Sequence, residues 1–308
     1  MSKIGTFFEL FLHDRKKLKI AFARNFEKTK LSHIVSDKMF LSFVYKAHFG
    51  EKLNLKDPQT FNEKLQWLKL FYRDPEQIKL VDKYEVKKYI TEMIGEEYII
   101  PTLGIYERFE DINFDALPDQ FVLKCTHDSG STVICRDKST FDYTAAKTKL
   151  SKKLKNNLFW HGREWPYKNV KPRIIAEKYI TTDGEAPNDY KFFCFNGEVK
   201  CFKIDYDRYT DHRANYYSPS GELLHFGEAV CPPDFDRVVP LPRLKDKMIE
   251  LAEKLSFGYS FLRVDFYEIG DQIYFGELTF YPASGFGAFV PAEWDLTLGS
   301  WIELPNIK

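Results

Sequence analysis

The amino-acid sequence predicts an α+β fold with a helical N-terminal region. Helical spacing and helix-capping signals are concentrated in the first 95 residues, and short strand-like runs begin at Tyr98. Two turn signals, Asn196-Gly197 and the segment around Gly270, join strands that follow one another directly in the sequence. Strands joined by tight turns pair antiparallel, and their separation from the N-terminal helices indicates α+β rather than alternating α/β order.

Composition sets the broad class of the protein. The chain has 308 residues, is 44% hydrophobic, and contains 45 Lys and Arg residues against 45 Asp and Glu residues. A chain of this size forms a substantial core and divides into two or three subdomains. The balanced charge excludes a global field that recruits nucleic acid, although it allows local charged patches.

The cysteines and the N-terminus indicate the compartment. The five cysteines are odd in number and show no CxxC spacing, which is typical of reduced thiols in a cytoplasmic protein. We expect no secretory signal, because the apolar run 6–12 is short and contains Glu9. No later run approaches the length of a membrane span.

The N-terminal residues 1–20 have two interpretations. Apolar residues recur there at helical spacing, and a basic run follows them: Ile4, Phe7, Phe8 and Phe11, then Arg15, Lys16, Lys17 and Lys19. One interpretation is a helix packed on the body of the protein with a solvated basic end. The other is a peripheral contact with the inner face of an anionic membrane.

Further helices are expected up to Gly95. Residues 36–75 are predicted to form helices joined by a loop at Asp57-Pro58, with Thr60 as an N-cap and Glu63 completing a capping box. Another helix is predicted over residues 76–94.

The first strands frame a polar loop. Strands are predicted at 98–101, 121–124 and 133–135, and the loop 125–132 between the last two contains Gly130. A strand that ends in Lys124 and opens into a small polar loop offers a cation and backbone N–H groups to phosphate oxygens. An ordinary hairpin turn is the alternative.

The middle of the chain combines helix, strand and loop. We predict a Lys-rich helix at 143–158, a buried strand at 173–180 and a hairpin of 189–195 with 198–205. After the hairpin we predict a proline-rich surface excursion at 206–243 that helps to bind a second substrate, and then a helix at 244–255. On the hairpin, Lys191 shares a strand face with Asp189, where it either snorkels or binds an anion.

The segment 261–280 brings acidic residues together. Arg263 and Asp265 share one strand face, and Glu277 and Thr279 share a face of the next strand. A three-residue loop, 270–272, places Asp265 opposite Glu277, whereas a two-residue loop places them on different faces.

Facing carboxylates repel unless a cation or proton lies between them. We interpret the acidic pair as a Mg²⁺ site with Arg263 beside it for a negatively charged oxygen; the alternative is an edge hairpin with solvated charges. The loop 281–287 is expected to be flexible and to lie over the reacting groups.

Read together, these segments resemble the ATP-grasp superfamily and, within it, the TupA-like (teichuronopeptide-biosynthesis) family of polysaccharide-biosynthesis proteins. The resemblance covers roughly residues 40–305 and depends on the segments 58–67, 82–84, 121–130, 189–193, 263–267 and 276–280. It implies an ATP-grasp fold, in which two α+β subdomains grip ATP. The implied division is a helical N-terminal region at 1–95, a small subdomain with the phosphate loop at 96–180, and a C-terminal subdomain with the Mg²⁺ hairpin at 181–308.

The resemblance also implies ATP and Mg²⁺ as cofactors and a set of site residues. Those for ATP are Lys83 and Lys124 for the phosphates, His127, Ser129, Gly130 and Ser131 in the covering loop, Glu177, Lys178, Tyr179 and Ile180 at the adenine hinge, and Asp183 or Glu185 for the ribose. The catalytic and metal residues are Lys191 and Arg263 for the transferred phosphoryl group, and Asp265, Glu277 and Thr279 for Mg²⁺. Thr279 replaces the usual Asn and is a weaker oxygen ligand.

The activity implied by the resemblance is that of an ATP-dependent carboxylate–amine ligase acting through an acyl phosphate. The implied substrates are an amino acid and a uronic acid of a surface polysaccharide or its precursor, and no nucleic acid is expected as a partner. Two other readings stay open. One is an ATP-dependent sugar or small-molecule kinase, and the other is a glycosyltransferase whose acidic pair holds a nucleotide-sugar diphosphate through a metal.

Overall fold

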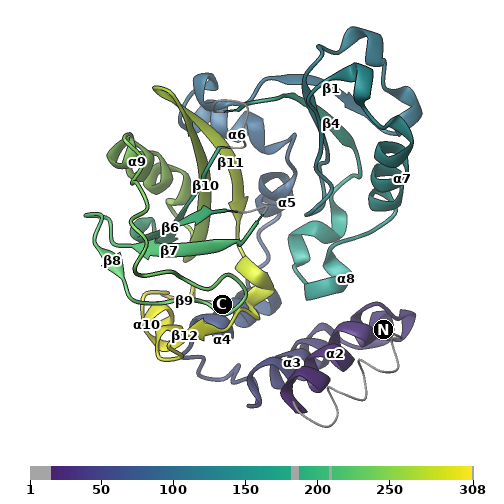
Figure 1. Cartoon of the computed structure of the whole chain (residues 1–308). Helices are drawn as coiled ribbons and strands as arrows, with labels where there is room; N and C mark the ends of the chain where they lie inside the picture. The colour runs from purple at the N-terminus through teal and green to yellow at the C-terminus, as the bar shows by residue number, and fades with distance from the viewer. Residues whose placement is uncertain (1–14, 182–186, 208–209, 307–308) are drawn as a thin grey trace.

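Two antiparallel sheets, each backed by helices, determine the architecture (Figure 1). The computed structural model describes residues 15–181, 187–207 and 210–306. The expected helical pattern at 4–11 and the candidate Asp183 lie outside these ranges. The division of the chain at residues 95 and 180 stays a prediction.

The first sheet has the strand order β1-β4-β2-β3. Its strands are β1 (Thr102–Tyr106), β2 (Phe121–Cys125), β3 (Val133–Cys135) and β4 (Ile174–Lys178). Helix α7 (Tyr143–Leu154) covers it, since Ala146 and Leu150 pack in one cluster with Phe121 and Leu123. The strands and the loop predicted around Lys124 are therefore present.

The second sheet has the order β11-β10-β5-β6-β7-β8. Its strands are β5 (Asp189–Phe195), β6 (Glu198–Tyr206), β7 (Arg213–Tyr217), β8 (Leu223–Leu224), β10 (Phe261–Ile269) and β11 (Gln272–Thr279), and β9 (Gly227–Glu228) pairs separately with β12 (Phe289–Val290). The surface excursion predicted at 206–243 is wrong for Arg213–Tyr217, because β7 extends the sheet from β6 and four of its five residues are buried. Its sequence, ending in two tyrosines, suits a strand packed in a sheet.

The helices outside the first sheet are α2 (Arg15–Glu27), α3 (Asp37–Phe49), α4 (Phe61–Phe71), α5 (Glu76–Val81), α6 (Val86–Met93), α8 (Phe159–Gly162), α9 (Lys245–Ser256) and α10 (Trp294–Ser300). Short 3₁₀ helices are η1 (Lys30–Ile34), η2 (Glu96–Tyr98), η3 (Phe109–Asp111), η4 (Phe114–Ala116), η5 (Lys138–Thr140), η6 (Trp165–Asn169) and η7 (Pro282–Gly285). Apolar residues of α4, α5, α6 and α9 share the core of the second sheet. None of the described helices is long and apolar enough to cross a membrane.

The capping box before α4 is confirmed. The Thr60 hydroxyl accepts from the Glu63 backbone N–H at 3.1 Å, and the Glu63 carboxylate accepts from the Thr60 N–H at 3.2 Å. The single helix predicted over 76–94 is wrong, because the chain breaks between α5 and α6. There the Asp82 carboxylate accepts from the backbone N–H of Tyr84 at 2.8 Å, which replaces helical hydrogen bonding at this point.

Two other boundaries differ from the predictions. The strand expected at 98–101 begins at Thr102, because residues up to Tyr98 form η2. The helix expected at 143–158 ends at Leu154. Beyond it, the Asn157 side chain accepts from the Phe159 backbone N–H at 3.0 Å and starts α8.

The hairpin of β10 and β11 corrects the predicted turn but keeps the predicted pairing. The turn has two residues, Gly270 and Asp271, because Ile269 pairs with Gln272. A bulge then shifts the register, so that Asp265 still lies opposite Glu277. Gly276 is the extra residue of the bulge, and a Cβ there would lie 3.0 Å from the Asp265 carbonyl oxygen.

The loop expected to be flexible at 281–287 is instead fastened to α4. Gln66 Nε2 donates to Gly285 O at 2.6 Å, and Lys69 Nζ donates to Ser284 O at 2.7 Å. Buried side chains of α4 therefore hold the backbone of this segment in place.

Candidate functional site

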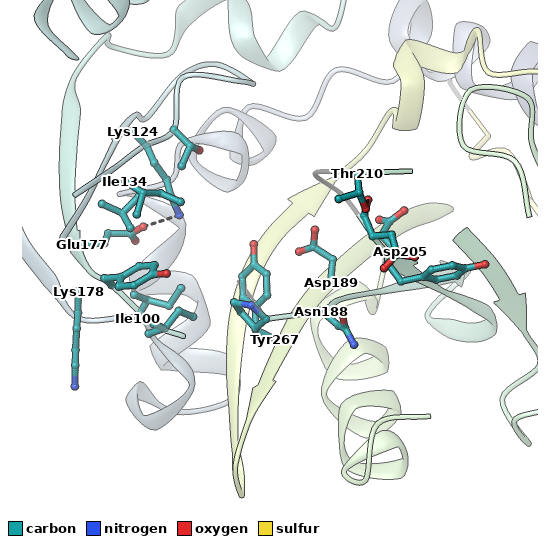
Figure 2. Close-up of a pocket in the computed structure, with 17 residues that line it drawn as sticks. Ile100, Lys124, Ile134, Glu177, Lys178, Asn188, Asp189, Asp205, Thr210 and Tyr267 are labelled. Atoms are coloured by element: carbon teal, nitrogen blue, oxygen red, sulfur yellow. Dashed lines mark hydrogen bonds and ion pairs between the residues drawn. The ribbon is translucent and has the colours of Figure 1, made fainter. Parts of the chain in front are cut away.

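A cavity of about 500 Å³ is lined by residues of both sheets (Figure 2). A second cavity of about 350 Å³ adjoins it and reaches the β10–β11 hairpin. Residues that line both cavities are Ile100, Lys124, Thr132, Glu177, Asp189 and Tyr267. The two cavities thus form one continuous space that runs from the first sheet to the acidic hairpin.

The first cavity has an apolar end beside the end of β4. The predicted hinge residues Lys178, Tyr179 and Ile180 line it, and Val122 and Ile134 supply apolar side chains. A planar ring fits between such side chains, and the exposed backbone after a strand offers hydrogen bonds to its edge. This is the arrangement expected for a nucleotide base.

Glu177, predicted at the adenine hinge, pairs with two lysines at the wall of the cavities. Its carboxylate is 5% exposed and lies 2.6 Å from Lys87 Nζ and 2.9 Å from Lys124 Nζ. Burial acts to raise the pKa of Glu177, but the two ammonium groups outweigh it and hold the pKa below its usual range. Glu177 therefore positions two lysines at the wall shared by both cavities.

The phosphate-type loop lies where the sequence predicts. Lys83, Ser129 and Gly130 line the second cavity together with Lys124. Lys83 Nζ donates to Asp128 O at 2.5 Å, and Lys153 Nζ donates to Ser129 O at 2.8 Å, so that cations fasten the loop backbone. Positive charge and a Gly-containing loop thus meet in one place.

Two predicted loop residues are placed elsewhere. The Ser131 hydroxyl accepts from the Cys125 backbone N–H at 2.8 Å and is buried. His127 is 2% exposed with Nε2 at 3.0 Å from Asn156 O, and burial lowers the pKa of its imidazole. Neither is among the described residues that line the two cavities, and both support the loop from behind.

A row of alternating charges crosses the second sheet. Arg263 forms two bonds of 2.7 Å to the Asp265 carboxylate and one of 2.9 Å to Glu277 Oε1. On the other side of Asp265, Lys191 Nζ lies 3.0 Å from Oδ2. Burial acts to raise the pKa of Asp265, but Arg263 and Lys191 outweigh it and hold the pKa below its usual value.

Lys191 is surrounded by carboxylates. Besides Asp265, it lies 3.3 Å from Asp189 and 3.4 Å from Asp205. Burial alone lowers the pKa of an ammonium group, but here the three aspartates outweigh it and raise the pKa of Lys191 above its usual range. Lys191 therefore stays charged at the floor of the second cavity, which it lines.

The acidic pair fits a divalent cation. Asp265 and Glu277 lie opposite each other, and one guanidinium nitrogen of Arg263 already bridges them. Arg263 thus supplies the positive charge between the two carboxylates in this structure, and oxygen ligands of this kind also suit Mg²⁺. Thr279 is not among the described residues that line the two cavities, and its hydroxyl donates to Glu277 Oε1 at 3.3 Å.

A second set of metal-ligand residue types lies further along β6. Single ligand atoms of Asp205, His212 and Cys231 lie within 4.8 Å of one another. However, Asp205 also faces the ammonium groups of Lys191 at 3.4 Å and Lys203 at 3.7 Å. Asp265 of the hairpin pair likewise lies 3.0 Å from Lys191 and 2.7 Å from Arg263, so nearby cations do not separate the two candidate sites.

The structure adds residues that the sequence analysis did not assign to the site. Asp205 completes the surroundings of Lys191, Lys87 joins Lys124 on Glu177, and Lys203 lies 3.3 Å from Glu228 on the neighbouring part of the sheet. Lys87 is four residues after Lys83, a helical spacing that signals a shared face. The other contacts depend on strand register, which cannot be read from the sequence.

Comparisons with known proteins concern the family and the fold. The model of the family described as TupA-like ATP-grasp matches residues 63–303, which is most of the chain. A comparison with curated proteins gave no match.

Among solved structures, the chain is similar to the D-alanine–D-alanine ligase from Bacillus anthracis complexed with ATP, at 18% identity and a TM-score of 0.36, over 65% of this chain and 54% of that one. It is also similar to the ATP-grasp ligase PsnB complexed with a phosphomimetic variant of its minimal precursor, Mg and ADP, at 12% identity and a TM-score of 0.39, over 78% and 61%. For the D-alanine–D-alanine ligase from Helicobacter pylori, the identity is 15% and the TM-score 0.39, over 79% and 69%. The chain thus spans less than two thirds of the first two proteins.

Proposed function

Because the chain belongs to the TupA-like ATP-grasp family, we propose that it is an ATP- and Mg²⁺-dependent ligase that joins a carboxylate to an amine. The observation that carries this proposal is the continuous cavity in which Lys83 and Lys124 face Asp265 and Glu277. Cations for phosphate oxygens and carboxylates for a metal are both required for phosphoryl transfer, and here they line one space.

In this proposal the nucleotide runs from the first cavity into the second. The base lies against Val122 and Ile134 and bonds to the backbone of residues 178–180. Lys83 and Lys124 bind phosphate oxygens, with the loop at Ser129 and Gly130 above them. Asp183 or Glu185 remains our proposal for the ribose.

The hairpin residues act on the reacting end. Asp265 and Glu277 would hold Mg²⁺, with Thr279 behind Glu277, and the bound ion would neutralise charge on the phosphates. Lys191, which lines the second cavity, and Arg263, which bridges Asp265 and Glu277 beside it, would hold negative oxygen as charge develops on the transferred group.

The proposed chemistry has two steps. A substrate carboxylate oxygen attacks the γ-phosphorus of ATP, and the bond from that phosphorus to the β-phosphate oxygen breaks. ADP departs, and the carboxylate has become an acyl phosphate. An amine then attacks the carbonyl carbon, phosphate leaves with the electron pair of the C–O bond, and loss of a proton from nitrogen gives the amide. The protein contributes positioning and charge stabilisation.

We propose that the acceptor pair is an amino acid and a uronic acid of a surface polysaccharide or its precursor, and that the reaction takes place in the cytoplasm, where ATP is available. The family description supports the ATP-grasp chemistry, and the substrate pair is inferred from the polysaccharide context of the resemblance. The loop between β6 and β7, which adjoins the first cavity at Asp207 and Thr210, is the proposed location of substrate selection.

The first experiment is isothermal titration with ATP, a non-hydrolysable ATP analogue and UDP-sugars, each with and without Mg²⁺. We expect ATP to bind with Mg²⁺ dependence and UDP-sugars to bind weakly. Product analysis with uronic and amino acids then separates the activities: an amide with ADP and phosphate supports the ligase. A stable phosphorylated product without amide identifies a kinase, and preferential binding of a UDP-sugar identifies a glycosyltransferase.

A further inference from the structure

We propose that α2, η1 and α3 form a docking surface for an anionic phospholipid bilayer. We call the described residues 17–46 of these elements the N-terminal surface. This inference uses no residue of the cavities and does not depend on the proposed ligase activity. It is carried by the charges, the exposed apolar side chains and the rigid attachment of this surface.

The N-terminal surface is strongly basic within a chain of zero net charge. Its basic side chains are all exposed: Lys17, Lys19, Arg24, Lys28, Lys30, Lys38 and Lys46. The region contains only two acidic residues, Glu27 and Asp37. The outward-facing charge is therefore almost entirely positive.

Both acidic residues are engaged with the body of the protein. Asp37 lies 2.8 Å from Arg73 and 3.1 Å from the buried Arg163. Glu27 is partly buried, and burial raises the pKa of its carboxyl to about 7 in spite of Lys69 and Arg24 nearby. Neither acid offsets the exposed lysines, so the surface complements an anionic partner.

Exposed apolar side chains lie among these lysines. They are Phe22 (61% exposed), Leu31 (63%), Ile34 (81%), Met39 (66%) and Phe43 (39%). The rings of Phe22 and Phe43 are 6.1 Å apart, which joins the apolar residues of α2 to those of α3. Single exposed apolar residues are ordinary, but a contiguous group marks an interaction site.

The opposite side of the surface is firmly attached. Ala23, Phe40, Leu41 and Val44 are buried. In η1, Arg163 donates to Ser32 O at 2.6 Å, and the His33 ring stacks on Trp160 with centroids 3.8 Å apart. Because Ser32 and His33 contact the body of the protein, Leu31 and Ile34 are held facing outward. Binding to a partner then costs little conformational entropy, since these side chains are already in place.

The location suits docking on a flat surface. Figure 1 shows α2 and α3 at one end of the molecule, beyond α4 and α8 and away from α7 and α9. A surface that combines exposed lysines with large apolar side chains matches the interface of an anionic bilayer, where headgroups bind cations and the acyl boundary accepts apolar groups. A nucleic acid would use the lysines but leave the aliphatic side chains in water.

The test is flotation of the full chain with vesicles of 30% phosphatidylglycerol in phosphatidylcholine and with vesicles of phosphatidylcholine alone. We expect binding to the anionic vesicles only. Replacing Lys28, Lys30 and Lys38 by Gln is expected to lower the partition coefficient about a hundredfold, since each basic residue near such a surface contributes roughly fivefold. Replacing Leu31, Ile34 and Met39 by Ser is expected to lower it at least tenfold.

The matched control replaces three comparably exposed apolar residues elsewhere by Ser: Val230 (70% exposed), Val238 (91%) and Phe257 (82%). It is expected to bind like the wild type, and circular dichroism checks the folding of every variant. Equal binding to both vesicle types, or binding that survives both triple variants, overturns the proposal.

Deletion of residues 1–14 tests the other occupant of this surface, the chain's own N-terminus. If the full chain does not bind and the deleted chain does, the N-terminal segment covers the surface and the proposal is wrong. If the deletion abolishes binding while the triple variants retain it, those residues and not the N-terminal surface are the anchor. Retained binding by the deleted chain, with loss in both triple variants, supports the proposal.

Discussion

Replacing Lys191 by Met tests the charge row of the second sheet directly. The ammonium group lies 3.0 Å from Asp265, 3.3 Å from Asp189 and 3.4 Å from Asp205, and the residue is 7% exposed. At these distances each contact is an attraction of about 5 kcal/mol for an effective dielectric constant near 20. Desolvation of the ammonium group costs several kcal/mol in the opposite direction, so removing this partner should destabilise the fold by about 3–5 kcal/mol.

The pH dependence of this loss has a defined sign. In the wild type the pKa of Asp265 is held below its ordinary value, so its contribution to stability is present above that value and is lost as the pH falls through the lowered pKa. In Lys191→Met the pKa of Asp265 rises, because the carboxylate loses one of the two cations that hold the pKa down. As the pH falls, protonation then removes the carboxylate repulsion in the variant before it affects the wild type. The difference in unfolding free energy between the wild type and the variant should therefore shrink between pH 8 and pH 5.

The assay is urea unfolding at pH 8, pH 6.5 and pH 5 in the presence of EDTA. The control is Lys254→Met, which removes an exposed contact of 2.7 Å to Glu250 on α9 and should leave the unfolding midpoint almost unchanged. If Lys191→Met loses no more stability than this control, or if its loss does not vary with pH, Lys191 is not the ion that neutralises the three aspartates.

Three further predictions follow from the same geometry. Glu277→Gln should lower ATP turnover at least about a hundredfold and leave the urea midpoint unchanged, because that side chain is 45% exposed. Asp265→Asn should lower both turnover and the urea midpoint, because it deprives buried cations of their partner. Turnover and urea unfolding measured on both variants check this prediction. Lys87→Met should raise the KM for ATP roughly tenfold, because Glu177 then pairs with Lys124 without Lys87, and Lys124 is less available to a phosphate. Steady-state kinetics measure this change. Thr60→Ala should cost about 1 kcal/mol in urea unfolding, since it removes the capping bond to α4, and an unchanged midpoint would contradict that role.

Local signals in the sequence predicted local structure well. The capping box at Thr60 and the turn at Asn196-Gly197 depend on residues close in sequence, and both are present. The strand ending at Lys124 and its loop are present for the same reason. The break between α5 and α6 was missed because Asp82 caps the chain while its other oxygen lies 2.9 Å from Arg173, a partner distant in sequence.

The pairing of the acidic hairpin shows how a correct result came from an incorrect turn. A two-residue turn with an unbroken ladder would pair Asp265 with Gly276 and turn Glu277 to the other face. The bulge at Gly276 adds the one residue that restores the pairing. A glycine inside a strand is a signal for such a bulge, so Gly276 is the residue from which the bulge could be predicted.

The second hairpin has the same device without a signal. From its two-residue turn, an unbroken ladder would pair Asp189 with Ile204. A register shift beside Cys194 instead pairs Asp189 with Asp205 and Lys191 with Lys203. No glycine marks this bulge, so the contact of Asp205 with Lys191 was beyond reach of the sequence.

These two bulges together determine the charge row, and the row has a consequence for binding. Three cations near the cavities already have a carboxylate partner: Lys124 has Glu177, and Arg263 and Lys191 share Asp265. A metal ion that takes the oxygens of Asp265 and Glu277 must displace Arg263, and a triphosphate is the partner that can accept the displaced cation. We therefore expect ATP and Mg²⁺ to bind more tightly together than either binds alone, because each provides what the other removes.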